Sequence, residues 1–94
     1  MKVHFFATLR PMAGSKTVDF DLPEGATIRS LVDAIVTRFP AMRPELLDAD
    51  GNLYLHVHVF VNGRDTHFLP LGMDTALSLS DVLNVFPAVG GGAW

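Results

Sequence analysis

The sequence predicts an α+β domain in which one main helix packs on one face of a sheet of four to five strands. Several segments alternate between apolar and polar residues with period two, and one segment has apolar residues at spacings of three and four. With 94 residues, 49% hydrophobic and 18% charged, the chain suits one small globular domain. We assign residues 1–89 to this domain and residues 90–94 to a flexible C-terminal tail.

Two strands that form a hairpin are predicted at the start of the chain. The first strand has apolar side chains at every second residue, namely Val3, Phe5, Ala7 and Leu9. Residues 10–15 contain Pro11 and Gly14, which interrupt this pattern. A second strand then carries its apolar positions at Val18, Phe20 and Leu22.

The main helix is predicted to begin after Thr27, whose hydroxyl can accept a hydrogen bond from a free N–H of the first turn. Its apolar stripe recurs at helical spacing and consists of Ile28, Leu31, Val32, Ile35 and Phe39. Pro40 disfavours helical geometry at the residue before it, so the helix should end near Phe39.

The clearest strand of the sequence is predicted over Leu53–Val61, where apolar residues again alternate with polar or aromatic ones. Asn62-Gly63 follows at once and favours a type I′ turn, so residues 64–69 should return as a short antiparallel strand. The remaining segments are a short helical turn at 43–48, a reversal at Asp50-Gly51, an irregular stretch at 70–80 and a last strand at 82–86, bounded by Pro87.

The alternation also predicts two different faces of the sheet. The face toward the helix should carry Val3, Phe5, Val57, Val59, Leu83 and Val85. The opposite face should carry Phe6, Phe60 and Phe86 together with His4 and His58. Exposed phenylalanines that lie near one another form the kind of apolar patch that marks a binding site. We therefore predict that Phe6, Phe60, Phe86 and His58 contact a partner protein.

Composition excludes several classes of function. Seven basic and ten acidic residues give a net charge of −3, and no Lys/Arg cluster is visible, which argues against nucleic-acid binding. No apolar run approaches about eighteen residues and no charged-then-apolar leader is present, so we expect no membrane partner, no signal peptide and a cytoplasmic location. The absence of cysteine excludes a disulfide, a thiol nucleophile and a thiolate metal ligand.

Histidines provide the one pattern that suggests a metal site. His56 and His58 share a predicted strand face, and His4 can join them from the first strand. The spacing fixes no carboxylate nearby, and histidines on the solvent face of a sheet are common, so we expect no bound metal. The acidic stretch 48–52 is interpreted as a turn because leucine stands where a calcium loop needs glycine. No serine is forced beside a histidine, so the chain is not expected to be an enzyme in its own right.

The C-terminal residues are Gly90-Gly91-Gly92 followed by Ala93-Trp94. Glycines without Cβ atoms can pass through a narrow channel, which suits an arm that enters the active site of another protein. The alternative is a frayed terminus, the usual condition of end residues. We expect the arm to be mobile in either case.

In this order the segments resemble the ubiquitin-like β-grasp sulfur carriers, typified by the small subunit of molybdopterin synthase and the sulfur carrier of the thiamine pathway. The resemblance implies a mixed sheet and extends over nearly the whole chain. The matching segments are Phe5-Phe6-Ala7-Thr8-Leu9-Arg10, Leu22-Pro23-Glu24-Gly25-Ala26-Thr27-Ile28, Val61-Asn62-Gly63, Asp74-Thr75-Ala76-Leu77 and Phe86-Pro87-Ala88-Val89-Gly90-Gly91-Gly92. The chain is most similar to stand-alone members, among them the carrier that supplies sulfide for cysteine synthesis.

The resemblance implies a chemistry for the tail. In that family a ubiquitin-activating-enzyme-like protein uses ATP to adenylate the final glycine carboxylate, which becomes a thiocarboxylate and delivers sulfur to a synthase. The acyl group would lie on Gly92, and Gly90 and Gly91 would form the narrow segment of chain that leads to it. Ala93 and Trp94 continue past Gly92, so they would first have to be removed, as a zinc metalloprotease does for some carriers. No cofactor bound to the chain itself is expected.

Two other functions fit the same residues. One is a ubiquitin-like modifier that is joined to target lysines through Gly92. The other is a regulatory β-grasp domain that never uses its tail. Neither the pathway that receives the sulfur nor the oligomeric state follows from the sequence.

Overall fold

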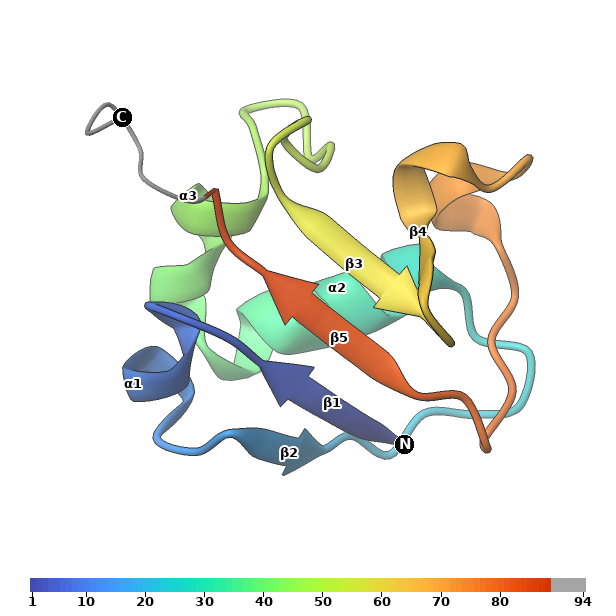
Figure 1. Cartoon of the computed structure of the whole chain (residues 1–94), viewed down its shortest axis with the longest axis horizontal. Coiled ribbons are helices and arrows are strands. Elements are labelled where there is room, and N and C mark those ends of the chain that lie inside the picture. Colours follow the sequence, from blue (N-terminus) through green and yellow to red (C-terminus); the bar gives the residue numbers. More distant parts are fainter. Residues whose placement is uncertain (89–94) are drawn as a thin grey trace.

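The computed structural model describes residues 1–88, which form one five-stranded sheet with a main helix across one face (Figure 1). Neighbouring strands lie in the order β2-β1-β5-β3-β4. The strands are β1 (Lys2–Phe5), β2 (Thr17–Asp19), β3 (His58–Val61), β4 (Arg64–Asp65) and β5 (Leu83–Phe86). Only the β1 and β5 pair is parallel, and the other pairs are antiparallel. The sheet is therefore mixed, and the predicted α+β class is confirmed.

The main helix is bounded as the sequence predicts. Thr27 caps α2 (Ile28–Arg38) by accepting a hydrogen bond of 3.2 Å from the Ser30 N–H, and the helix ends at Phe39, before Pro40. The other helices are short: α1 (Leu9–Ala13), α3 (Arg43–Leu46) and the 3₁₀ helices Pro40–Met42, Thr66–Phe68 and Gly72–Asp74. No helix within residues 1–88 has the length and apolar character to cross a membrane.

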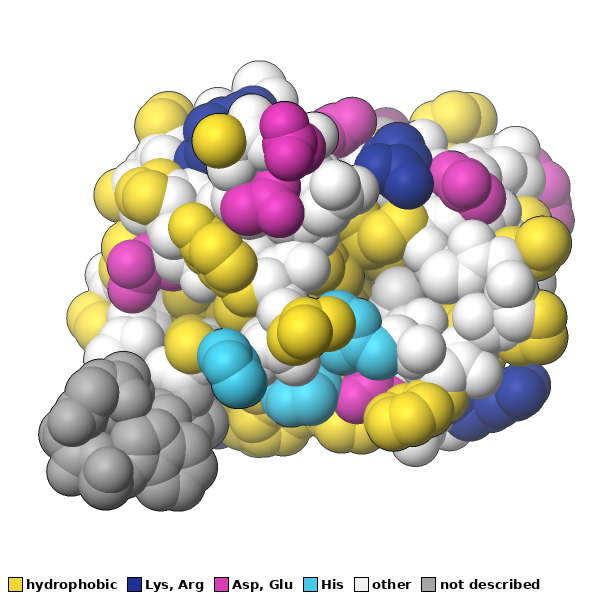
Figure 2. All heavy atoms as spheres, turned by 90° about the horizontal axis from the view of Figure 1, so that it is seen from above, with side chains coloured by type: hydrophobic (Ala, Val, Ile, Leu, Met, Phe, Trp, Pro, Cys, Tyr) yellow, Lys and Arg dark blue, Asp and Glu magenta, His cyan; other side chains and the backbone are white. Residues whose placement is uncertain are grey.

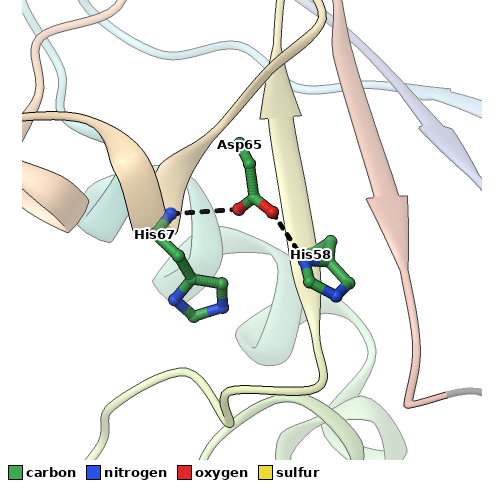
Figure 3. A group of neighbouring side chains, drawn as sticks. All are labelled: His58, Asp65 and His67. Carbon is green, nitrogen blue, oxygen red and sulfur yellow. Dashed lines mark hydrogen bonds and ion pairs between the residues drawn. The ribbon is translucent and has the colours of Figure 1, made fainter.

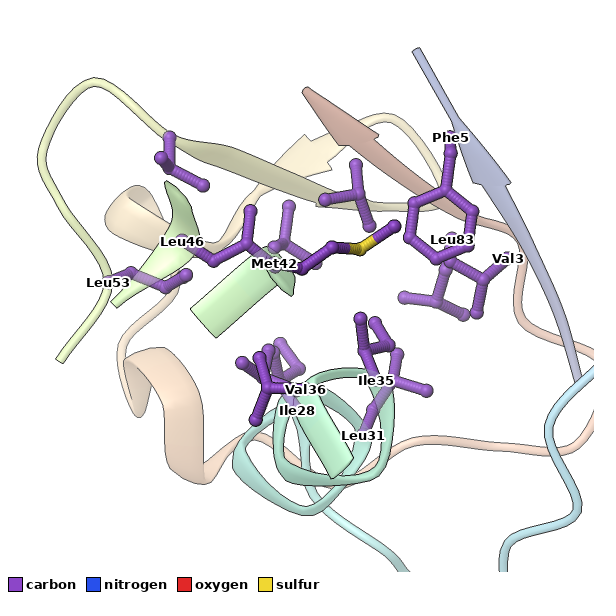
Figure 4. Packing of buried hydrophobic residues seen from close by; sticks show 14 of the residues in the cluster. Val3, Phe5, Ile28, Leu31, Ile35, Val36, Met42, Leu46, Leu53 and Leu83 are labelled. Carbon is purple, nitrogen blue, oxygen red and sulfur yellow. The ribbon is translucent and has the colours of Figure 1, made fainter. Parts of the chain in front are cut away.

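The core lies between α2 and the sheet (Figure 4). Ile28, Leu31 and Ile35 on α2 are fully buried, and Met42 and Leu46 close the space beside the helix. Each large apolar side chain in such a place contributes about 1.5–3 kcal/mol before entropy is subtracted. The predicted helix-facing residues of the sheet are confirmed, because the structure buries Val3, Phe5, Val57, Val59, Leu83 and Val85.

The first strand is shorter than the alternation predicts. It ends at Phe5, Ala7 has a positive φ of 53°, and Leu9 begins the five-residue helix α1. Pro11 is tolerated in so short a helix because the first turn needs no N–H donor there. Gly14 ends the helix in the left-handed conformation, and its N–H donates to the carbonyl of Arg10 over 2.9 Å. Leu9 is buried as predicted, but it lies in a helix and not in a strand.

The predicted strand over Leu53–Val61 is wrong in its first half. β3 begins at His58, whereas Leu53 makes an isolated bridge with Leu47. The Val57 N–H donates to the Tyr54 carbonyl over 3.0 Å, which closes a turn in the middle of the predicted strand. The Leu55 side chain, which the alternation would bury, is 79% exposed as a result.

The turn after β3 is confirmed. Asn62 and Gly63 both have positive φ, at 52° and 82°, as a type I′ turn requires. The returning strand β4 covers Arg64–Asp65 and is shorter than the predicted 64–69, because a 3₁₀ helix replaces the remainder. The Asp65 side chain caps that helix by accepting a hydrogen bond of 3.0 Å from the His67 N–H.

Candidate functional site

The central strand β5 leads toward the C-terminal tail. It lies between β1 and β3, and after it Pro87 is buried while Ala88 is exposed. The predicted tail residues, namely Gly90, Gly91, Gly92, Ala93 and Trp94, lie outside the described residues. The part of the site that the structure places is therefore the sheet around the end of β5.

An aromatic row crosses the sheet face that is turned away from α2. The row consists of Phe6, Phe86, Phe60 and His58, all half-buried. The rings of Phe6 and Phe86 stack with centroids 4.2 Å apart, and Phe60 meets Phe86 edge-on at 5.5 Å. His58 continues the row, 6.0 Å from Phe60. The structure thus brings together the four residues that the sequence predicts as a partner-binding group.

Arg10 lies at the Phe6 end of the row and was absent from the sequence-based site. Its guanidinium carbon is 5.0 Å from the centroid of the Phe6 ring, a cation–π distance. Its Nε–H donates to the Phe5 carbonyl over 2.8 Å, which holds the side chain in place. The row therefore has a positive charge at one end. Sequence reasoning missed Arg10 because it assigned residues 10–15 to a turn and did not expect α1.

At the other end of the row, His58 belongs to a cluster with Asp65 and His67 (Figure 3). His58 Nδ1 is 2.7 Å from Asp65 Oδ2, and the centroids of the two imidazole rings are 5.6 Å apart. His67 Nε2 is also 2.7 Å from the carbonyl oxygen of Val57. Seen from above, histidine side chains gather among hydrophobic ones beside an acidic side chain (Figure 2).

The three histidines that the sequence grouped do not come together in this way. His4 Nδ1 is 2.9 Å from the Thr17 hydroxyl on the neighbouring strand, and β5 lies between the strands of His4 and His58. His56 is exposed and precedes β3. Asp65 and His67 were missed, although a signal for them existed. The tight turn pairs Phe60 with Asp65 and so returns the chain beside β3, where the His67 ring reaches the carbonyl oxygen of Val57.

Comparison with known families gives a match over most of the chain. The model of the ThiS family matches residues 3–92, a range that runs from β1 through the three glycines. Small archaeal modifier protein 3 of Haloferax volcanii is 34% identical over 92 residues, which are 98% of each chain. The sulfur carrier protein CysO of Mycobacterium tuberculosis is 30% identical over 87 residues, which are 89% of each chain.

Solved structures show the same fold. The crystal structure of small archaeal modifier protein 1 of Haloferax volcanii superposes with a TM-score of 0.80 at 34% identity, covering 94% of this chain and 95% of that one. A chain in the crystal structure of the Amycolatopsis orientalis BexX/CysO complex gives a TM-score of 0.78 at 27% identity, with 94% of each chain covered. The expected ubiquitin-like β-grasp fold is thereby confirmed.

Proposed function

The chain belongs to the ThiS family, and from that premise we propose that it is a cytoplasmic sulfur carrier whose working residue is Gly92. The observation that carries the proposal is that the family match includes Gly90-Gly91-Gly92 and stops before Ala93. Once the bond between Gly92 and Ala93 is cleaved, the Gly92 carboxylate attacks ATP, forms an acyl-adenylate and releases pyrophosphate. A sulfur donor then displaces AMP and leaves a thiocarboxylate.

The glycine residues suit this chemistry. Without Cβ atoms they can pass through a narrow channel to the active site of a partner. An extended chain spans about 3.3 Å per residue, so the segment from Pro87 to Gly92 can reach about 16 Å. The thiocarboxylate can therefore be formed and used by other proteins while the sheet stays outside their active sites. The chain is then a co-substrate of an adenylating enzyme and of a sulfur-accepting synthase, and it needs no bound cofactor.

The aromatic row is the surface that we propose for the adenylating enzyme. Large half-buried aromatic side chains in mutual contact are typical of the residues that dominate binding energy at interfaces. Phe86 is the last residue of β5, so a partner that covers the row also lies beside the segment that leads to the tail. The solved BexX/CysO complex supports a protein partner in general, because there a similar chain is found in a complex with another protein.

Conjugation to proteins is a second function, favoured by the relatives named small archaeal modifier proteins. The same acyl-adenylate would serve it. A lysine amine in place of sulfide would attack the Gly92 carbonyl carbon, release AMP and leave an isopeptide bond. The two functions thus share the tail, the cleavage after Gly92 and the activating enzyme, and they differ only in the nucleophile.

One experiment separates these functions. The chain ending at Gly92 is incubated with its activating enzyme, ATP, a sulfide source and a lysine-bearing acceptor protein, and all masses are measured intact. Replacement of one oxygen by sulfur in the chain is the expected result and supports the carrier. A covalent adduct with the acceptor would instead support the modifier. If neither product forms in an ATP-dependent way, both proposals fail and the regulatory β-grasp domain is the better description.

A further inference from the structure

The cluster of His58, Asp65 and His67 has a geometry that the proposed function does not use. Each residue offers one potential ligand atom, and these three atoms all lie within 4.8 Å of one another. We propose that the cluster binds a divalent transition-metal ion of the Zn²⁺ class, through one imidazole nitrogen from each histidine and one carboxylate oxygen. Water would complete the coordination, as in open zinc sites with three protein ligands. This proposal replaces the sequence-based expectation that the chain has no metal site.

The hydrogen bonds of His67 leave one ring nitrogen ready for a metal. Its Nε2 lies 2.7 Å from the Val57 carbonyl oxygen, which can only accept, so Nε2 of the neutral ring carries the proton. Nδ1 therefore keeps its lone pair. Metal-binding histidines are commonly oriented in this manner, by donating the other ring N–H to a carbonyl or carboxylate oxygen.

His58 and Asp65 form the other half of the site. The His58 ring now donates its Nδ1–H to Asp65 over 2.7 Å, and because the side chain is 40% exposed, water can take part in moving that proton to Nε2 so that Nδ1 faces the ion. The Asp65 side chain is only 11% exposed, and among residues 1–88 it forms an ion pair with no lysine or arginine. A shielded carboxylate is costly without a positive partner. A divalent cation would supply that charge permanently, whereas a histidine supplies it only when protonated.

The backbone holds the three residues close before any ion arrives. The type I′ turn at Asn62-Gly63 fixes β4 against β3, and the Thr66 hydroxyl donates to the Val59 carbonyl over 2.6 Å. A tetrahedral zinc ion with bonds of about 2.0–2.1 Å places its ligand atoms about 3.3 Å apart. The potential ligand atoms, which lie within 4.8 Å of one another, would have to approach to about this separation, and rotation of the side chains is the movement that the proposal requires.

The test uses the full chain, without a polyhistidine tag and stripped of metal by a chelator. Zn²⁺ should bind with a stoichiometry of one in calorimetry and should raise the Tm by several degrees, because an ion that binds only the folded state stabilises it. Co²⁺ should give the visible absorption of a low-symmetry site. The variants His67→Gln and Asp65→Asn should each weaken Zn²⁺ binding at least about tenfold. Glutamine keeps a donor for Val57, asparagine keeps an acceptor for the cap, and the metal-free Tm verifies that both variants fold.

His56→Gln is the matched control, because His56 is exposed and outside the cluster. This variant should bind Zn²⁺ as the unaltered chain does. The proposal is overturned if Zn²⁺ does not raise the Tm of the unaltered chain, if the cluster variants bind as tightly as it does, or if His56→Gln loses as much affinity as they do. An equal effect of Mg²⁺, which prefers oxygen ligands, would also contradict it. Zn²⁺ binding and thiocarboxylation are measured separately, so neither result depends on the other.

Discussion

Phe6 and Phe86 stack nearly in parallel, with ring centroids 4.2 Å apart and planes inclined by 11°. The parallel pairing of β1 with β5 produces this contact, because it sets Phe5 beside Val85 and thus brings the residues that follow each of them together. The stack joins the residue that follows β1 to the last residue of β5, the strand that leads to the tail. A partner that contacts the stack therefore also lies at the end of β5, where the segment that leads to the tail begins.

Phe60→Glu should weaken binding to the activating enzyme by at least about tenfold, because a carboxylate would be desolvated in an aromatic contact. Phe60 is half-buried on the face opposite α2, so the folded state can keep the new charge in water and the Tm should change little. Affinity is measured by calorimetry with the chain ending at Gly92, and Tm by circular dichroism.

Phe68→Glu is the control for that prediction. Phe68 is 85% exposed and lies in a 3₁₀ helix outside the aromatic row, so the same charge there should leave the affinity unchanged. Equal loss of affinity in both variants would point to net charge as the cause. Loss of folding in the Phe60 variant would mean that the two faces of the sheet are misassigned.

Arg10→Ala should lower the free energy of unfolding by about 1–2 kcal/mol. The change removes the hydrogen bond from Nε to the Phe5 carbonyl and the cation over the Phe6 ring. Arg10→Lys should recover part of this loss, because lysine keeps the charge but lacks the planar guanidinium. Urea unfolding of the three chains provides the measurement. A lysine variant no more stable than the alanine variant would exclude a contribution from the cation–π contact.

The fold was predictable where several local signals agreed. For α2, the capping Thr27, the apolar stripe and Pro40 all specify the same boundaries, and the structure has them. Alternation alone was less reliable. Over Leu53–Val61 it predicts one strand, but the first half forms a turn because the Val57 N–H bonds to the Tyr54 carbonyl. The spacing of apolar residues does not reveal such a hydrogen bond. At Leu9, the same spacing does not distinguish the buried end of a strand from the buried start of a short helix.

The aromatic row was predictable from the sequence because alternation assigns faces even where strand lengths are wrong. Val59 and Val85 are buried, so Phe60 and Phe86 beside them must lie on the other face. Arg10 was not predictable in this way, since its position depends on α1. To predict the cluster of His58, Asp65 and His67, one needs to know how the two strands of the β3–β4 hairpin pair, and the pattern of a single strand does not give this. For that reason His58 was grouped with the wrong histidines.

Met42→Ala should destabilise the fold by about 2–5 kcal/mol, because Met42 is fully buried between the sheet and α2 and its removal leaves a cavity (Figure 4). Leu71→Ala is the comparison. The Leu71 side chain is 67% exposed, so its truncation should change the free energy of unfolding by less than about 0.5 kcal/mol. Chemical denaturation measures both, and similar losses in the two variants would contradict the described core.

Gly63→Ala should lower the stability by about 1 kcal/mol through backbone strain alone. A Cβ at Gly63 would meet no atom within 4 Å, but its φ of 82° is unfavourable for any residue with a side chain. Asn62→Gly is the informative comparison, because glycine tolerates the positive φ but loses the hydrogen bond that Asn62 Nδ2 donates to Asp81 and the one that Asn62 Oδ1 accepts from the Val82 N–H. Thermal unfolding of the two variants and of the unaltered chain measures these effects. A Gly63→Ala variant as stable as the unaltered chain would argue against the type I′ turn.

Cleavage after Gly92 should be required before sulfur is loaded. Adenylation needs a free carboxylate, and in the sequence the carbonyl of Gly92 is bonded to the nitrogen of Ala93. The chain contains no cysteine that could carry sulfur by another route. With ATP, the activating enzyme and sulfide, only the chain ending at Gly92 should gain the mass of a sulfur-for-oxygen exchange. The full-length chain should gain it only when a protease that removes Ala93-Trp94 is added.

Two controls make the cleavage result interpretable. The chain ending at Gly92 without ATP should keep its mass, which shows that the exchange proceeds through the adenylate. The full-length chain should bind the activating enzyme through the aromatic row with an affinity similar to that of the shorter chain, so that its lack of reaction reflects the blocked carboxylate. Equal thiocarboxylation of the full-length chain with no protease present would refute the role of Gly92, because the sulfur would then have to enter at another group.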